Sequence, residues 1–260
     1  MGNLQGKVAV VTGAGREKGL GEAIARRLAA DGAKIVISDI GETKGKIAPE
    51  HGVGQVSEME KVAAQLRDEG ADVITNICNV MNENDVENMV KSTVDHFGRI
   101  DILVNNAGIG YLFGPLLETT QEEWDAVLGV NLRGVFFGIK HAAKQMIDQG
   151  EGGRIINIGS QASKSAFKFT SAYTSSKHGL LGLTRNAALE LAEHKITVNL
   201  VCPNHVTTGL GSWQNSFLAE SRGLSVEDYL EQLKARIPMG RVGLPEDTAN
   251  ACAFLASDES

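Results

Sequence analysis

The sequence predicts an α/β fold built on a doubly wound parallel sheet with helices on both faces, in a single domain spanning residues 1–260. First, short apolar runs rich in Val and Ile alternate with amphipathic stretches, which specifies a parallel sheet covered on both faces. Second, a glycine-rich loop at 13–21 separates the first apolar run from the first amphipathic stretch. Third, Asp39 ends the next apolar run, about twenty residues after that loop. Together these features predict a Rossmann-type dinucleotide-binding domain.

Six apolar runs predict the strands, and stretches with helical periodicity predict the helices between them. The strands are expected at 7–11, 34–39, 72–78, 101–105, 154–159 and 196–202. The helices are expected at 22–31, 58–69, 83–97, 120–146 and 225–236, with one more that carries Tyr173 and ends near 193. A capping box of Thr120 with Glu123 opens the long helix at 120–146. Residues 40–56 are expected to form a surface excursion.

Composition narrows the class of protein. With 260 residues and 42% hydrophobic residues, the chain can bury one sizeable core. The net charge of −7 argues against a general attraction to nucleic acid or to acidic membranes. Cys78, Cys202 and Cys252 are far apart and have no metal-ligand spacing, as expected of reduced thiols in a cytoplasmic protein. We therefore expect no metal site, no secretory signal and no membrane-spanning segment.

The glycine loop and Asp39 predict how a cofactor binds. Backbone amides in such a loop, together with a helix N-terminus, can receive a pyrophosphate. The loop lacks the G-x-G-x-x-G spacing, so by itself it also fits an ordinary strand-to-helix turn. The Asp39 carboxylate would accept hydrogen bonds from free ribose hydroxyls and repel a 2′-phosphate, whereas Arg16 in the loop would attract one. We expect Asp39 to outweigh Arg16 and to favour NAD by about tenfold or more in kcat/KM.

Tyr173 and Lys177 are four residues apart, so on a helix they share one face. A phenol with a pKa near ~10 is a poor base unless a positive charge such as the Lys177 ammonium stabilises its phenolate. The bare pattern is weak evidence, and its surroundings decide its meaning. Ser160 follows the fifth expected strand, at the edge where parallel sheets bind ligands. Asn131 is the exception: it lies mid-helix among apolar residues, as a structural anchor or a functional group.

These features, taken in order, resemble the short-chain dehydrogenase/reductase family over essentially the whole chain. The resemblance rests on Thr12-Gly13, Asn105-Asn106-Ala107-Gly108, Asn131, Ser160, Tyr173-x-x-x-Lys177 and Pro203. It implies that Tyr173 transfers the proton to or from the substrate oxygen and that Lys177 lowers the Tyr173 pKa and holds the nicotinamide ribose. It further implies that Ser160 hydrogen-bonds the substrate oxygen and that Asn131 holds a water in a proton relay.

The resemblance also implies a set of NAD contacts. They are Gly13, Arg16, Gly19, Leu20, Asp39, Ile40, Asn79, Val80, Asn106, Ala107, Gly108, Val206 and Thr208, with Tyr173 and Lys177. Gln161, Phe167 and Trp213 are expected to line an apolar substrate pocket. The excursion at 209–240 is expected to be a lid over it; the alternative is a helical hairpin packed on the body or on a neighbouring subunit. A homo-oligomer, tetramer or dimer, is also expected.

The chain departs from the family pattern at four places. Two extra residues separate Gly13 from Gly19, Asn79 stands where an acid is common, and Asn204 replaces the glycine after Pro203. The family also continues into a seventh strand past the position of Ser260, so either the sequence is part of a longer chain or that edge strand is missing. The insertion at 40–56 and the segment 203–208 are similar to those of carveol-dehydrogenase-like, mycofactocin-associated members.

The leading hypothesis is therefore an NAD-dependent oxidoreductase that interconverts a secondary alcohol and a ketone. One alternative is an NADP-dependent 3-oxoacyl-type ketoreductase. A second is an enoyl reductase, which the lengthened loop resembles but which spaces its tyrosine and lysine more widely than Tyr173 and Lys177. A third is a non-catalytic nucleotide-sensing protein on the same fold.

Overall fold

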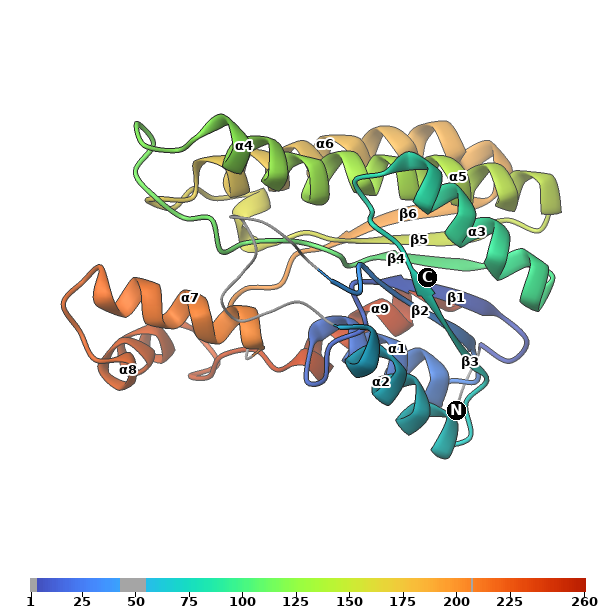
Figure 1. Ribbon diagram of the computed structural model, residues 1–260, viewed down its shortest axis with the longest axis horizontal. Helices are drawn as coiled ribbons and strands as arrows, with labels where there is room; N and C mark the ends of the chain where they lie inside the picture. Colours follow the sequence, from blue (N-terminus) through green and yellow to red (C-terminus); the bar gives the residue numbers. More distant parts are fainter. Residues whose placement is uncertain (1–3, 43–54, 207) are drawn as a thin grey trace.

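The computed structural model describes residues 4–42, 55–206 and 208–260, and its central element is a six-stranded sheet (Figure 1). The strand order is β3-β2-β1-β4-β5-β6 and every pairing is parallel. The strands are β1 (Val8–Thr12), β2 (Lys34–Asp39), β3 (Val73–Ile77), β4 (Ile102–Asn105), β5 (Gly153–Ile158) and β6 (Ile196–Val201). The order reverses between β1 and β4, and ligands of such sheets bind at the carboxyl ends of the strands beside this reversal. The predicted fold class is confirmed.

Helices cover both faces of the sheet (Figure 1). One layer contains α1 (Leu20–Ala30), α2 (Val56–Asp68) and α9 (Pro245–Ala256); the other contains α3 (Glu83–Phe97), α4 (Gln121–Leu128), α5 (Val135–Gln149) and α6 (Ser171–Leu191). Successive strand side chains point to opposite faces. In β1, Ala9 and Val11 accordingly join the core under α1 and α2, whereas Val10 joins the core under α3 and α5.

Helix α9 is one that the sequence analysis did not predict. Its buried apolar residues are small, namely Ala249, Cys252, Ala253 and Ala256, so they give a weak apolar period. They pack against the core that α1 covers, and Pro245 stands at the first position of the helix, where its missing N–H costs nothing. Close approach of α9 to α1 therefore depends on side-chain size more than on hydrophobicity.

The helix expected at 120–146 is interrupted. The predicted Thr120–Glu123 capping box is present, but α4 ends at Leu128 and a π-helical segment, Gly129–Gly134, precedes α5. A continuous α-helix is therefore wrong for these six residues. Such π-helical insertions in helices are frequent at functional sites, and Asn131 lies in this one with its side chain fully buried.

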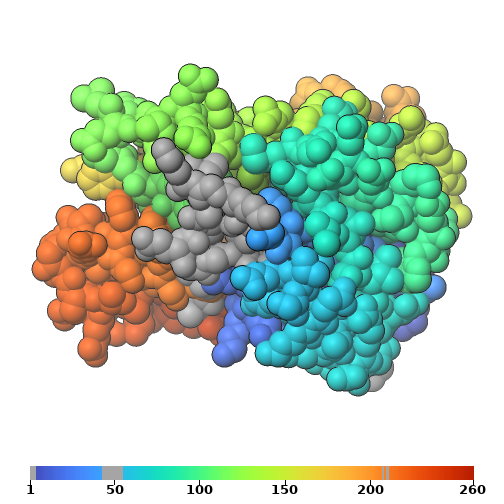
Figure 2. Space-filling view, in the orientation of Figure 1, coloured from blue at the N-terminus to red at the C-terminus, as the bar shows by residue number. Residues whose placement is uncertain are grey.

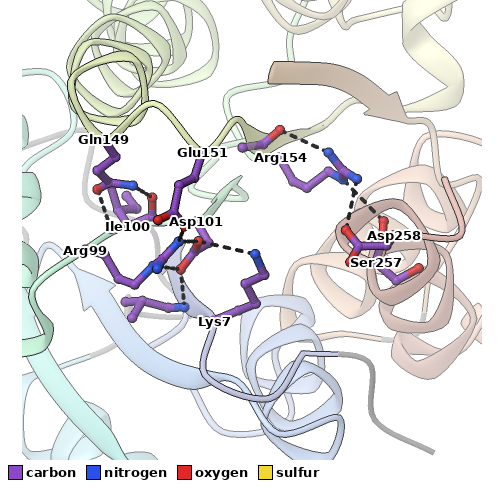
Figure 3. Close-up of polar contacts among 11 residues, drawn as sticks. Lys7, Arg99, Ile100, Asp101, Gln149, Glu151, Arg154, Ser257 and Asp258 are labelled. Atoms are coloured by element: carbon purple, nitrogen blue, oxygen red, sulfur yellow. Dashed lines mark hydrogen bonds and ion pairs between the residues drawn. The ribbon is translucent and has the colours of Figure 1, made fainter. Parts of the chain in front are cut away.

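A polar network ties the strands together at the edge opposite their carboxyl ends (Figure 3). The buried Asp101 carboxylate accepts hydrogen bonds from the Val8 amide at 2.9 Å and from the Arg99 guanidinium at 2.8 and 2.6 Å. Nearby, the Arg154 guanidinium lies 3.3 Å from the Asp258 carboxylate. These contacts join β1 to β4 and attach β5 to the segment that follows α9.

After β6 the chain forms α7 (Gly209–Glu220) and α8 (Val226–Arg236), which lie beside the body of the molecule rather than on the sheet (Figure 1). Helix α8 matches the prediction, with the Ser225 hydroxyl accepting a hydrogen bond from the Asp228 amide. In the space-filling view, this segment lies directly against the chain that follows β4 (Figure 2). Among the described residues, no helix is long and apolar enough to cross a membrane.

Candidate active site

The carboxyl ends of β1 and β4 are joined by side chains of the predicted motifs. The Thr12 hydroxyl accepts hydrogen bonds from the Asn106 and Ala107 amides, each at 3.1 Å. The Asn106 side-chain amide donates to the carbonyls of Thr12 at 2.8 Å and of Gly13 at 2.9 Å. Gly13 has φ +65°, and a Cβ there would stand 2.7 Å from the Ala107 Cα. These residues hold the two strand ends together at the reversal of strand order.

The loop after β1 ends at an uncapped helix N-terminus. Gly19 is the N-cap of α1 and provides no side-chain cap, so the first N–H groups of α1, beginning at Leu20, are suited to bind a ligand. A Cβ on Gly21 would stand 2.4 Å from the Gly13 carbonyl oxygen, which shows how closely the loop folds back. This bare turn fits a dinucleotide pyrophosphate.

Asp39 lies at the end of β2 and faces the same loop. One carboxylate oxygen accepts a hydrogen bond from the Gly15 amide at 2.9 Å, and the other accepts from the Ile40 amide at 2.8 Å. Burial raises the pKa of this carboxyl, and the two amide hydrogen bonds oppose the rise. The arrangement fits an acid that holds ribose hydroxyls, because each carboxylate oxygen has a further lone pair.

At the end of β3, Asn79 and Val80 take part in a turn. The Asn79 side-chain oxygen accepts a hydrogen bond from the Met81 amide at 3.1 Å. A Cβ on Gly134 would stand 2.9 Å from a Val80 methyl, so Val80 packs closely on the π-helical segment. Both predicted positions lie at the carboxyl edge of the sheet.

Tyr173 and Lys177 lie one turn apart in α6, as the sequence predicts. The Lys177 Nζ donates to the Ile158 carbonyl at 2.8 Å and lies 5.7 Å from the centre of the Tyr173 ring. Burial lowers the pKa of Lys177 to about 8. Burial raises the pKa of Tyr173, whereas a hydrogen bond with the Ser160 side chain lowers it. Three of the predicted catalytic side chains are thus brought together in one cluster, in which Lys177 is buried and Tyr173 and Ser160 are half-buried.

Asn131 reaches this cluster through the backbone of Ile109. Its side-chain oxygen accepts from the Ile109 amide at 2.8 Å, and its amide group donates to the Ile109 carbonyl at 2.9 Å and to the Ser176 hydroxyl at 3.2 Å. A Cβ on Gly108 would stand 3.4 Å from the Asn131 oxygen and 3.9 Å from the Lys177 Nζ. The residue that sequence reasoning set apart from the ligand-binding edge is therefore adjacent to Lys177.

An aromatic cluster extends from Tyr173 to α7. The Phe113 ring contacts the rings of Tyr173, Trp213 and Phe217 at centroid distances of 5.9, 5.7 and 5.9 Å. Trp213 and Phe217 stack at 5.5 Å, and the Phe169 ring lies 6.3 Å from that of Phe217. The predicted role of Trp213 in an apolar pocket fits this arrangement. The Tyr111 ring lies 6.4 Å from that of Trp213. We refer to Tyr111, Phe113, Phe169, Trp213 and Phe217 as the aromatic cluster.

The other predicted substrate residues lie at the ends of neighbouring elements. Gln161 begins a short 3₁₀ turn, and its amide donates to the Pro203 carbonyl at 2.8 Å. Phe167 is 44% exposed, while Phe169, which the sequence analysis did not name, contributes the ring that meets Phe217. Only the proximity of α7 identifies Phe169, because its own segment has no helical or strand period.

Thr208 and Val206 lie at the N-terminus of α7. The Thr208 hydroxyl accepts from the Gly211 amide at 3.2 Å as the N-cap of α7, and the Thr208 amide donates to the Val206 carbonyl. One turn into the helix, the Gln214 side chain donates to the Gly110 carbonyl at 2.9 Å. Most of the surface excursion expected at 40–56, with its basic residues Lys44 and Lys46, lies outside the described residues. No group of His, Cys, Asp and Glu within the described part of the chain could hold a metal ion.

The open parallel sheet, with a glycine turn after β1, an acid ending β2 and these side chains at its carboxyl edge, defines a nucleotide-binding α/β protein. A family model described as enoyl-(acyl carrier protein) reductase matches residues 13–260. The chain is 39% identical over 256 residues to a short-chain dehydrogenase/reductase of Armillaria gallica, covering 98% of this chain and 91% of that protein. It is 34% identical to a diacetyl reductase of Staphylococcus epidermidis described as (S)-acetoin forming, covering 98% and 93%.

Among solved structures, carveol dehydrogenase from Mycobacterium avium in complex with NAD is similar, with a TM-score of 0.91 and 31% identity over 100% of this chain and 94% of that one. The chain therefore belongs to the short-chain dehydrogenase/reductase family, as its motifs predict. It is an oxidoreductase of that family. Assignment to the carveol-dehydrogenase-like branch remains a prediction.

Proposed function

We propose that the protein is an NAD-dependent oxidoreductase that interconverts a secondary alcohol and a ketone. The observation that carries the proposal is the cluster in which Tyr173 interacts with Ser160 and the Nζ atom of the buried Lys177 lies 5.7 Å from the centre of the Tyr173 ring. A phenol beside a cation can exchange a proton with an oxygen atom of the substrate. The similarity to a diacetyl reductase supports chemistry at a carbonyl group.

In the direction of alcohol oxidation, the Tyr173 phenolate oxygen takes the hydroxyl proton of the substrate while Ser160 hydrogen-bonds the same oxygen atom. Bound NAD supplies the acceptor for the hydride that leaves the carbinol carbon. Lys177, whose pKa of about 8 leaves it charged at pH 7, stabilises the phenolate by its positive charge. Asn131 fixes the Ile109 backbone beside Lys177 and serves the proton relay.

The residues proposed to contact NAD lie at the carboxyl edge of the sheet. Asp39 would hold the adenosine ribose, the amides after Gly19 would hold the pyrophosphate, and Gly108 would let the nicotinamide ribose approach Lys177. The remaining predicted contacts are proposed in the same roles: Gly13, Arg16, Leu20, Ile40, Asn79, Val80, Asn106, Ala107, Val206 and Thr208. Support for NAD comes from the Asp39 geometry and from the NAD complex of the similar carveol dehydrogenase.

The substrate is proposed to be a neutral, largely apolar alcohol or ketone. The aromatic cluster adjoins Tyr173 through Phe113, and aromatic walls favour apolar ligands. Helix α7 carries Trp213 over the site, so residues 209–240 are proposed to act as a lid. Gln161 and Phe167 remain predicted pocket residues.

Further proposals concern organisation. We propose that residues 1–260 act as a single dinucleotide-binding and catalytic domain in a cytoplasmic homo-oligomer, a tetramer or dimer. An apolar groove of about 390 Å³ between α5 and α6, lined in part by Phe136, Ile147 and Leu183, supports a contact between subunits. Phe136 and Ile147 are partly exposed there.

An enoyl reductase is a weaker candidate. The matched family model carries that description, and the lengthened glycine loop resembles that branch. The four-residue interval between Tyr173 and Lys177 supports alcohol–ketone chemistry instead, because enoyl reductases of this fold space the two residues more widely. A set of enoyl thioesters should therefore not be reduced.

A screen of secondary alcohols with purified protein and NAD, followed at the nicotinamide absorbance, tests the function. Tyr173→Phe should lower turnover of any substrate found by about 10²–10⁴-fold while NAD binding is kept. Retention of most of the alcohol oxidation would exclude Tyr173 as the base. The unmutated enzyme should prefer NAD over NADP by about tenfold or more in kcat/KM, and Asp39→Ala should narrow this gap.

A further inference from the structure

Two carboxylates bind alternate amides of the glycine loop. The Asp39 carboxylate accepts from the Gly15 amide at 2.9 Å, and the Glu58 carboxylate accepts from the Glu17 amide at 3.0 Å. Residues two apart along a chain are separated by at most about 7 Å. The two carboxylates therefore lie close to each other along the loop, although Glu58 comes from α2 and Asp39 from β2.

The first turn of α2 is firmly placed beside Asp39. A Cβ on Gly15 would stand 2.9 Å from the Asp39 Cβ and 3.0 Å from the Met59 Cβ, so all three residues meet closely. Met59 is buried in the core. Its neighbour Glu58 is consequently held near Asp39 by packing as well as by its hydrogen bond.

Residue Glu17 attaches the lengthened loop to the same helix. Its carboxylate accepts hydrogen bonds from the Lys61 ammonium at 2.8 Å and from the Gln65 amide at 3.0 Å. These contacts, with the bond from the Glu17 amide to Glu58, fix the loop at three points. The two extra residues of the loop therefore do not leave Glu58 remote from the cofactor-binding edge.

The charges near Asp39 have opposite signs. The negative charge of Glu58 raises the pKa of Asp39, and the positive charge of Arg16 lowers it. The effect of Glu58 is the larger of the two. The Lys61 ammonium is paired with Glu17, and Lys18 acts on Glu17. Next to the ribose-binding acid, Glu58 thus offsets the positive charge that would otherwise favour a phosphate.

We propose that Glu58 is a second cofactor-discriminating residue, which disfavours a 2′-phosphate at the adenosine ribose and counteracts Arg16. This inference rests on the proposed binding of the adenosine ribose at Asp39. The Glu58 carboxylate is half-buried, so salt weakens its repulsion of a phosphate over a distance of about 10 Å. Glu58 therefore contributes less than Asp39, whose carboxylate is in reach of the ribose itself.

The test compares two probes that differ only in the 2′-phosphate, adenosine 5′-monophosphate and adenosine 2′,5′-bisphosphate. Their binding is measured by calorimetry, which needs no alcohol substrate. Glu58→Gln keeps an oxygen that can accept from the Glu17 amide and removes the charge. It should strengthen binding of the bisphosphate by about three- to tenfold, leave the monophosphate within about twofold, and lose this effect in high salt.

Glu60→Gln is the matched control, because it removes the same charge from the same helix. Glu60 faces β3, where its carboxylate accepts from the Thr75 hydroxyl and lies 3.8 Å from the Arg67 guanidinium. The ratio of the affinities for the two probes should be the same in this variant as in the unmutated protein. An equal ratio change in both variants would mean that general charge, and not the position of Glu58, is responsible, and would overturn the proposal.

The outcomes separate this inference from the proposed function. If the unmutated protein binds the bisphosphate more tightly than the monophosphate, the proposed NAD preference is wrong. If it prefers the monophosphate but Glu58→Gln leaves the ratio unchanged, only the role of Glu58 is refuted. If the variant weakens both probes together, Glu58 holds the loop without discriminating between cofactors, and the proposal again fails.

Discussion

Replacing Lys177 by Met should abolish most of the activity, while its effect on the free energy of unfolding should depend on pH. The Lys177 side chain is 6% exposed, and burial lowers its pKa from 10.5 to about 8. A decrease of this size corresponds to roughly 3 kcal/mol by which the charged ammonium destabilises the folded state. Methionine has a similar length and no charge, so Lys177→Met removes this penalty at pH 7.

The substitution also removes a hydrogen bond. The Lys177 Nζ donates to the Ile158 carbonyl at 2.8 Å, and a buried carbonyl left without a partner costs about 1–3 kcal/mol. At pH 7 the variant should therefore be as stable as the unmutated protein or more stable by up to about 2 kcal/mol. It should bind NAD poorly and be nearly inactive, since Lys177 is proposed to hold the ribose and to stabilise the Tyr173 phenolate.

The difference in the free energy of unfolding should change sign at alkaline pH. Below pH 8 the lysine is charged in the folded and unfolded states, and the full penalty applies. Between pH 8 and 10.5 the unfolded chain binds the extra proton, so the unmutated protein gains stability relative to the variant as pH rises. At pH 10 the neutral amine still donates to Ile158, and the variant should be less stable by about 1–2 kcal/mol.

Urea denaturation of both proteins at pH 7, 8.5 and 10 measures this change. Subtracting one free energy of unfolding from the other at each pH cancels the contribution of groups that titrate equally in both proteins. Lys144→Met, at an exposed lysine of α5, controls for the general loss of a lysine. A Lys177→Met difference that stays constant from pH 7 to 10 would refute the reasoning, because it would mean that burial does not disfavour the charged Lys177 side chain.

Two further predictions concern the edges of the molecule. Asp101→Ala should lower the free energy of unfolding by about 2–4 kcal/mol, since it removes the buried acceptor of the Val8 amide and one of the two carboxylates paired with the Arg99 guanidinium. The NAD affinity of the folded protein should not change, because Asp101 lies at the opposite edge of the sheet, and a loss of affinity in the fully folded variant would contradict this. Amides of α7 should exchange hydrogen more slowly when NAD and a ketone analogue are both bound, as for a closing lid, whereas unchanged protection would favour a permanently packed hairpin.

Features carried by local spacing were predictable from the sequence. The bounds of β2 and α3 match the prediction residue for residue, because an apolar run or a helical period depends only on near neighbours. The pairing of Tyr173 with Lys177 follows from the four-residue repeat of a helix. The position of Asp39 follows from the end of a strand, and parallel strands end at the same edge.

Features that depend on contacts between remote elements were not predictable in this way. Periodicity predicts which face of a helix is buried but not what packs against it. The hydrogen bond between the Glu58 carboxylate and the Glu17 amide therefore could not be predicted from the sequence. The same holds for Asn131, because its π-helical segment is stabilised by hydrogen bonds to the Ile109 backbone. The ring contacts of Phe113 with Trp213 likewise exist only because α7 folds back over Tyr173, across about a hundred residues of sequence, a separation that local propensity cannot encode.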